Sequence, residues 1–190
     1  MKNLDVVRGD FDRIGDWTTT YSGRVFWPLD PRPEEIEIAD IAHALSQQCR
    51  WTGHTIEFVS VAQHSILVSE NCAPRDALWG LLHDAAEAYL VDLASPIKHL
   101  KEFYVYREME SGILQMIARR FGLPEEIPES VHIADKNVLA TEVRDCMRPG
   151  KMRPEWYGIP LKERIVPLSA PRAELLFLER FHELRKTHLQ

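Results

Sequence analysis

Residues 81–89 read LLHDAAEAY and place His83, Asp84 and Glu87 in a segment otherwise built from apolar residues. On an α-helix each residue advances by about 100°, so these three side chains share one side with Gly80. The apolar stripe on the opposite side consists of Leu78, Leu81, Leu82, Ala85 and Tyr89. Two interpretations are open, a solvated helix face or a metal site with an acid-base group beside it. On this segment alone, the solvated face is the commoner case.

Apolar residues at helical spacing continue through most of the chain after residue 35. Besides 75–90, the expected helical segments are 34–50, 59–72, 104–121, 129–147 and 170–186. Before them, glycines and prolines, Gly9 among them, alternate with aromatic residues, which favours a short hairpin. We therefore expect an all-α helical bundle with a short extended N-terminal segment.

The chain is expected to form one domain, because 190 residues with 45% hydrophobic content suffice for one core. Its central part would span about 36–147, with an N-terminal cover of 1–35. The proline-rich stretch 148–160 is interpreted as a loop before the last helix, since too little chain follows it for a second core. Residues 148–190 would thus be a C-terminal loop and helix of the same domain.

Composition excludes several classes of protein. The cysteines, Cys49, Cys72 and Cys146, are odd in number and share no C-x-x-C spacing, which argues against a zinc knuckle or a disulfide framework and favours a reducing cytoplasm. No apolar run approaches the roughly 20 residues that span a bilayer, and the first residues do not resemble a signal peptide. A net charge of -6 and a pI near 5.8 disfavour polymeric nucleic acid as a ligand.

Two further segments point ligand-type residues inward. His64 lies in VSVAQHSILVS, which is apolar nearly all round and so predicts a buried helix. Asp135 shares its predicted face with Val131, Ala134 and Val138, where an ionised carboxylate is costly unless a cation or metal pairs with it. Either residue alone has an ordinary structural explanation, but together they favour a site.

The combined set of two imidazoles and two carboxylates suits Mn, Fe, Co, Ni or Mg better than a closed structural zinc site. A metal held this way keeps open positions, lowers the pKa of water and neutralises a phosphate oxygen. Glu87, one helical turn after His83, is placed to move a proton.

The pattern H…HD…D, with HDAAE at its centre, resembles the signature of the HD-domain phosphohydrolases. The run HDAAEAYLVDLASPIK (83–98) is similar to the bacterial 5'-deoxynucleotidases, which have HD-x-x-E, an aspartate five residues later and a D-L-x-x-P-hydrophobic-K loop. The pair Arg50-Trp51, fourteen residues before His64, also matches. Phage-type dATP triphosphohydrolases share this arrangement, and the resemblance covers about 36–147.

The resemblance implies roles for individual residues. It implies that a metal is held by His64, His83, Asp84 and Asp135. Glu87 would be the catalytic acid-base group, and Asp92 a second catalytic or substrate-orienting carboxylate. Arg50 would clamp phosphate, which suits its planar guanidinium. Trp51 would pack on the sugar and leave no room for a 2'-hydroxyl, which favours deoxy substrates.

The substrate contacts keep alternative interpretations. Arg50 and Trp51 also fit a cation at a helix C-terminus beside a core aromatic. Lys98 is either a phosphate contact or a loop lysine, and His54 either touches phosphate or lies in a surface loop. Glu142, seven residues after Asp135, is a candidate hydrogen-bond acceptor or partner for Arg50. The other histidines are expected outside the ligand set: His43 and His132 as packing or supporting groups, and His99, His182 and His188 at the surface.

The expected function is metal-dependent hydrolysis of a deoxynucleotide, either a dNTP (notably dATP) or a 5'-monophosphate. The cofactor would be one divalent transition metal (Co, Mn, Ni, Fe or Zn), with Mg as a possible second ion. We expect a cytoplasmic homo-oligomer that binds small nucleotides and neither polymeric nucleic acid nor membrane. The alternatives are a nucleotide-sensing module whose chemistry has lapsed and a second-messenger hydrolase. The second would usually need extra histidines before the last aspartate, where only His99 and His132 lie.

Overall fold

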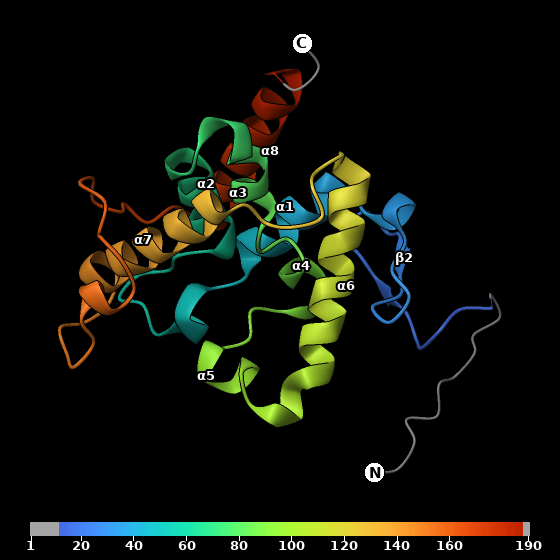
Figure 1. The fold of residues 1–190 in the computed structure, drawn as a ribbon, viewed down its shortest axis with the longest axis horizontal. Coiled ribbons are helices and arrows are strands. Elements are labelled where there is room, and N and C mark those ends of the chain that lie inside the picture. The colour runs from blue at the N-terminus through green and yellow to red at the C-terminus, as the bar shows by residue number, and fades with distance from the viewer. Residues whose placement is uncertain (1–11, 188–190) are drawn as a thin grey trace.

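The computed structural model describes residues 12–187; Gly9 and His188, like the rest of 1–11 and 188–190, lie outside this part. The expected all-α fold with an N-terminal hairpin is confirmed (Figure 1). The α-helices are α1 Ile38–Gln47, α2 Val61–Asn71, α3 Ala77–Leu82, α4 Glu87–Leu90, α5 Ser95–Lys98, α6 Tyr104–Phe121, α7 Glu129–Asp145 and α8 Ala170–Thr187. Short 3-10 turns join them: η1 Pro33–Glu35, η2 Arg50–Gly53, η3 Pro74–Asp76, η4 Lys101–Phe103 and η5 Pro154–Trp156.

The hairpin consists of β1 Thr18–Thr19 and β2 Val25–Phe26, which pair antiparallel. Phe26 is fully buried and stacks on Tyr89 with ring centroids 4.1 Å apart. Arg13 forms ion pairs with Asp30 and Glu35, each at 2.6 Å, and so fastens the chain before the hairpin to the chain after it. The described part of the N-terminal segment, from residue 12 on, is thereby fixed to the helical body.

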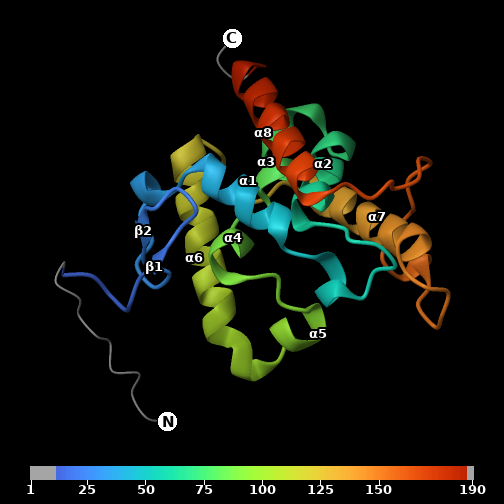
Figure 2. The ribbon, with the colours of Figure 1, turned by 180° about the vertical axis from the view of Figure 1, so that it is seen from behind.

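The main core lies where α8 packs across α1, α2 and α3 (Figure 2). These helices meet through fully or almost fully buried side chains, including Ile41, Leu45, Leu78, Leu81 and Phe177. A side chain of this size contributes about 1.5–3 kcal/mol on full burial, so the apolar stripes hold the bundle together. A smaller cluster around Trp79 joins α7 to α2 and α3.

Gly80 lets α3 approach α2 closely. A Cβ atom at this position would lie 2.8 Å from the Ser69 Cα and 2.9 Å from the Cys72 Sγ. Gly80 therefore admits the backbone of α2 at a distance that no other residue would allow. The crossing brings His64 of α2 next to His83, with ring centroids 5.4 Å apart.

The expected single helix over 75–90 is wrong, because the regular α-helix is interrupted at residues 83–86. Backbone hydrogen bonds there join residues three apart, for example Ala85 N–H to Leu82 O and Glu87 N–H to Asp84 O, both at 3.0 Å. The His83 Nδ1–H donates to Gly80 O at 2.8 Å and uses a carbonyl that an α-helix would need. The interruption therefore falls on the HDAAE motif itself.

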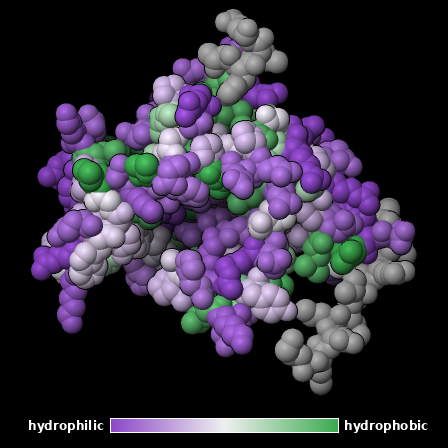
Figure 3. All heavy atoms as spheres, in the orientation of Figure 1, coloured by the Kyte–Doolittle hydropathy of each residue, from purple (hydrophilic) through white to green (hydrophobic). Residues whose placement is uncertain are grey.

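The helix expected over 34–50 also ends early, at Gln47. Trp51, Thr52 and Gly53 have φ values of 56°, 53° and 79°, which form a left-handed turn that no α-helix can contain. None of the described helices is long and apolar enough to cross a membrane. The face shown in Figure 3 is mostly hydrophilic, with small hydrophobic groups between.

Candidate metal centre

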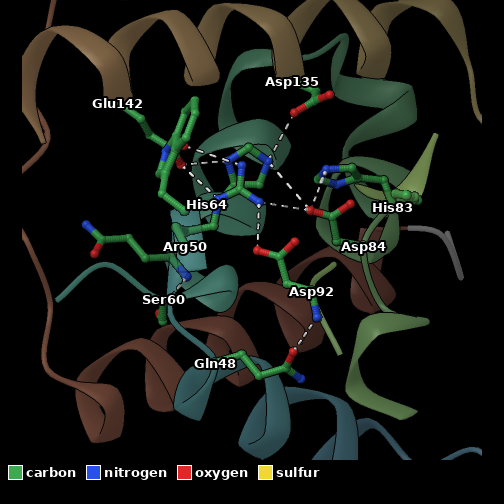
Figure 4. A network of polar contacts seen from close by, with 12 residues as sticks. Gln48, Arg50, Ser60, His64, His83, Asp84, Asp92, Asp135 and Glu142 are labelled. Carbon is green, nitrogen blue, oxygen red and sulfur yellow. Dashed lines mark hydrogen bonds and ion pairs between the residues drawn. The ribbon is translucent and has the colours of Figure 1, made fainter. Parts of the chain in front are cut away.

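The four predicted metal ligands meet at one point of the bundle (Figure 4). His64 comes from α2, and His83 and Asp84 follow α3; one ligand atom of each lies within 4.8 Å of the others. Asp135 of α7 places Oδ1 3.2 Å from the His64 Nε2. The Asp84 Oδ2 lies 3.3 Å from the His83 Nε2 and 3.7 Å from the His64 Nε2.

Each imidazole is held in place by a hydrogen bond from Nδ1, the ring nitrogen that faces away from the ligand cluster. The His64 Nδ1–H donates to the Glu142 Oε1 at 2.9 Å, and the His83 Nδ1–H donates to Gly80 O. Each Nε2 is buried and makes no hydrogen bond of regular geometry; its nearest acceptors are the carboxylate oxygens of Asp84 and, for His64, of Asp135. Metal-bound histidines in proteins are held in this way through their other ring nitrogen. The residues present therefore fit a divalent transition metal.

The interpretation as a solvated helix face is wrong, since the exposed fraction is 9% for His83 and 5% for Glu87. The prediction that the His64 helix is buried is confirmed, and His64 itself is inaccessible to solvent. Asp135 is partly exposed and lines the cavity described below.

Glu142 supports several of these groups from a fully buried position on α7. Besides His64, it accepts the Trp51 Nε1–H at 2.7 Å and faces the Arg50 Nε at 3.3 Å. Burial raises the pKa of Glu142, but Arg50 and His64 outweigh it and lower this pKa to about 2. Glu142 is thus ionised at neutral pH, and both proposed contacts of this residue, as an acceptor and as a partner of Arg50, are present.

The pKa of His64 is raised to about 9 in the metal-free protein. Burial and the Arg50 charge lower this pKa, and the carboxylates of Glu142 and Asp135 more than compensate. A metal on Nε2 takes the place of the proton that these carboxylates favour.

Arg50 is 8% exposed, and its Nη1 lies 3.8 Å from both the Asp84 Oδ2 and the Asp92 Oδ2. It stands in η2, after α1 has ended, so it is not a cation at a helix C-terminus. Trp51 is only partly buried and lines the cavity, so it is not a core aromatic either.

Glu87 and Asp92 face the same cavity as Arg50. Burial, with the charges of Asp84 and Asp92, raises the pKa of Glu87 well above its ordinary value. Burial also raises the pKa of Asp92, although Arg50 opposes the shift. A raised pKa favours the protonated form of a carboxyl group and so suits it to general acid catalysis.

The cavity has a volume of about 760 Å³. Its lining contains Arg50, Trp51, Thr52, His54, Asp84, Glu87, Asp92, Leu93, Ala94, Ser95, Pro96, Lys98, His99, Asp135, Leu139, Met147, Met152 and Tyr157. The candidate phosphate contacts His54 and Lys98 both belong to it, and Lys98 is paired with Glu110. His99, expected as an ordinary surface residue, is exposed but also lines the cavity.

The 148–160 loop contributes to the lining of the cavity, which was not predicted from the sequence. Tyr157 lies edge-on to Trp51, with ring centroids 5.9 Å apart and an interplanar angle of 87°. Only its place in an aromatic pair, Trp156-Tyr157, within a proline-rich loop distinguished it in the sequence. Among residues 12–187, none before Arg50 lines the cavity.

Three other described histidines, His43, His132 and His182, do not belong to the ligand cluster. His43 stacks on Tyr21 at 3.7 Å and faces Glu174, which agrees with a packing role. His182 is exposed, as expected. His132 is exposed on α7 rather than packed, because the buried face of that helix is occupied by Val131, Ala134 and Val138.

Two known proteins are relatives of this chain. No family model matches it. The uncharacterized protein YfdR of Escherichia coli (strain K12) is 39% identical over 168 residues, which are 87% of this chain and 93% of YfdR. The chain belongs to the YfdR family. An uncharacterized protein of Rhodobacter capsulatus is 40% identical over 130 residues, 63% of this chain and 65% of that protein. Neither the name YfdR nor that of the second relative states an activity.

Proposed function

We propose that this protein is a metal-dependent phosphohydrolase that acts on deoxynucleotides. The observation that carries the proposal is the pair of buried Nε2 atoms of His64 and His83, which make no hydrogen bond of regular geometry and face the carboxylates of Asp84 and, for His64, of Asp135. One divalent ion, Co, Mn, Ni, Fe or Zn, would be held there by His64, His83, Asp84 and Asp135, and Mg is a possible second ion.

The chemistry combines the ion with groups of the chain. The ion, when bound, polarises a phosphate oxygen and lowers the pKa of water. Arg50 offers its guanidinium to phosphate from the wall of the cavity. In hydrolysis a water oxygen bonds to phosphorus and the bond from phosphorus to the leaving oxygen breaks. Glu87 gives its proton to the leaving oxygen and recovers one from the attacking water, so protons balance over the cycle.

The deoxy preference is proposed from the resemblance of Arg50-Trp51 to the 5'-deoxynucleotidases and dATP triphosphohydrolases. Two features support it. Trp51 lies in the cavity wall, and its ring is fixed by the Glu142 hydrogen bond and by Tyr157. A fixed ring excludes a hydroxyl group more effectively than a mobile one, because it cannot move aside at low cost.

The alternative functions have less support. A lapsed sensing module has no need of a buried carboxyl group with a raised pKa beside a complete ligand set, and Glu87 is such a group. A second-messenger hydrolase with two metals would draw on His99 and His132. His99 bonds to Ser95, and His132 is exposed on α7; among the described residues neither belongs to the cluster of His64.

The test is to incubate the Co²⁺-loaded protein with dNMPs, dNTPs and NTPs and to identify the products by ion-exchange chromatography. We expect hydrolysis of deoxynucleotides, and the products distinguish removal of one phosphate from removal of triphosphate. His83→Ala and Asp84→Ala should lose both metal and activity, since each removes a ligand. His182→Ala, an exposed histidine of α8, is the control. Full metal loading without hydrolysis of any nucleotide would favour the sensing module.

A further inference from the structure

Gln48 connects three segments of the candidate site, although the sequence did not mark it. It follows α1 directly, and its carbonyl accepts the N–H of Val61, the first residue of the helix that carries His64. Its side-chain Nε2–H donates to Glu87 O at 2.9 Å, and its Oε1 accepts the Asp92 N–H at 2.8 Å. One amide group therefore joins both ends of the segment 87–92 (Figure 4 shows the Asp92 contact).

The segment that Gln48 joins contains an unfavourable backbone conformation. Val91 has φ 109° and ψ 149°, a region that β-branched residues rarely adopt. This conformation reverses the chain after α4, and the Asp92 carboxylate then lies 3.8 Å from Arg50. Besides Gln48, Tyr106 holds the turn by donating its hydroxyl to Val91 O. A strained turn persists only where such contacts outweigh its cost.

We propose that Gln48 is a positioning residue whose amide holds the 87–92 turn closed and thereby sets where the carboxyl groups of Glu87 and Asp92 lie. The catalytic part of this inference rests on the proposed function. Gln48 does not line the cavity, so it acts on the reaction only through the two carboxyl-bearing residues. A primary amide suits this position because it offers the donor and the acceptor that the two backbone groups need.

The first test compares Gln48→Met with Gln47→Met. Methionine keeps the length of the side chain and loses both hydrogen bonds, while Gln47 is an exposed neighbour whose recorded side-chain contact is with Ser46 at 3.5 Å. With the Co²⁺-loaded protein and its best deoxynucleotide, we expect Gln48→Met to lower kcat by about 10- to 100-fold, because small displacements of reacting groups are costly. KM should change less than about threefold, since substrate-contacting side chains are retained. Metal content should equal that of the parent.

An unchanged kcat in Gln48→Met, or a loss confined to KM, would overturn the proposal. The double variant Gln48→Met/Val91→Gly tests the strained turn directly, because glycine adopts this conformation without the steric cost. We expect the double variant to recover kcat several-fold over Gln48→Met. If it is as slow as the single variant or slower, the turn is not what Gln48 holds and the proposal fails.

A third measurement does not depend on hydrolysis. Hydrogen exchange of the Asp92 amide reports the bond to the Gln48 Oε1 directly, and we expect exchange at least about tenfold faster in Gln48→Met but not in Gln47→Met. If the parent hydrolyses no nucleotide, the proposed function fails while this exchange still decides the role of Gln48. Equal exchange in parent and Gln48→Met would show that the amide does not hold the turn.

Discussion

The imidazole of His64 lies between two carboxylates, Glu142 on Nδ1 at 2.9 Å and Asp135 on Nε2 at 3.2 Å. The two have different tasks. Glu142 is fully buried and ionised, so it keeps the proton on Nδ1 and leaves Nε2 for a metal. Asp135 is partly exposed at the cavity and can bind the same ion. Burial and the contacted ring nitrogen thus separate the two roles. Glu142 supports the imidazole, and Asp135 is available to bind the ion.

Glu87→Gln should separate chemistry from metal binding. The amide preserves the shape of the side chain but cannot exchange a proton, and general acid-base groups contribute roughly 10²- to 10⁴-fold to rate. We expect kcat to fall by that order, with metal content and thermal stability close to those of the parent. Elemental analysis and steady-state kinetics measure both quantities. Full activity in this variant would remove Glu87 from the mechanism.

Trp51→Ala should erode a preference for deoxynucleotides. If the indole leaves no room at C2', a ribonucleotide must bury a hydroxyl group without a partner, at about 1–3 kcal/mol. The ratio of kcat/KM for dATP over ATP, and for dAMP over AMP, should fall towards one in the variant. Affinity for both substrate classes should also weaken, because the stacking surface is lost. A preference that survives the substitution would mean that another group of the cavity, such as Tyr157, reads the sugar.

Sequence reasoning identified residues whose chemistry is unusual for their surroundings. His64 and Asp135 were recognised because each is polar within an apolar pattern, and Glu142 because it follows Asp135 by two helical turns. Gln48 could not be identified in this way, since its role depends on two backbone groups that approach it only after folding. Tyr157 was missed because helical periodicity carries no information about where a loop lies.

The α2 and α3 pair determines how close the two metal-binding imidazoles come. Helical periodicity predicted both segments, but it could not show that the second would break at His83. At the break, the His83 Nδ1–H donates to Gly80 O, and this hydrogen bond competes with the backbone hydrogen bonds of the helix. Local side-chain bonds of this kind are not visible in the spacing of apolar residues.

Gly80→Ala should weaken both the fold and the metal site. In an exposed helix interior, alanine gains about 1 kcal/mol over glycine. Here the new methyl group meets the Ser69 backbone at 2.8 Å, and overpacking of this kind costs about 1–3 kcal/mol. Because the Ser69 backbone cannot rotate away, we expect the cost of the clash to exceed the gain in helix propensity. The clash should also move His64 away from His83. Urea unfolding and metal titration should show lower stability and weaker binding.

Gly112→Ala is the matched control for this experiment. Gly112 also lies inside a helix, α6, but nothing stands within 4 Å of an added Cβ. Its replacement should therefore leave metal binding unchanged and raise stability by up to about 1 kcal/mol. Equal effects of the two substitutions would contradict the close crossing of α2 and α3.

At the scale of the whole molecule, the candidate site draws on segments from Arg50 to Tyr157. The main core lies under α8, while the ligands lie where α2 and α3 meet α7. Several buried charged groups, among them His64, Arg50 and Glu142, are concentrated at this place, whereas Arg13 and Asp40 are buried beside the N-terminal hairpin. The mutual pairing of His64, Arg50 and Glu142 makes the stability of the metal-free fold depend on pH.

The sign of that dependence follows from His64, whose pKa rises from 6.5 to about 9 in the metal-free fold. Because the pKa of His64 is higher in the folded than in the unfolded chain, protonation of this imidazole stabilises the fold. The stabilisation is complete at a pH below the unfolded-state pKa, and it is lost as the pH rises through about 9. A bound metal needs the neutral imidazole, so it offsets this loss. The gain in Tm on adding Co²⁺ should therefore grow between pH 6.5 and 9.

Glu87 complicates the measurement, because burial and its neighbouring carboxylates raise its pKa well above the ordinary value. Glu87 also loses a proton as the pH rises, and this loss lowers the stability of the fold, as the loss of the His64 proton does. The comparison is therefore best made in Glu87→Gln, which should retain the metal and removes this titration. Differential scanning fluorimetry with and without Co²⁺, over the same pH range, then follows His64 without the contribution of Glu87. A gain in Tm that stays constant or shrinks as pH rises would show that no ion replaces the proton on the His64 Nε2.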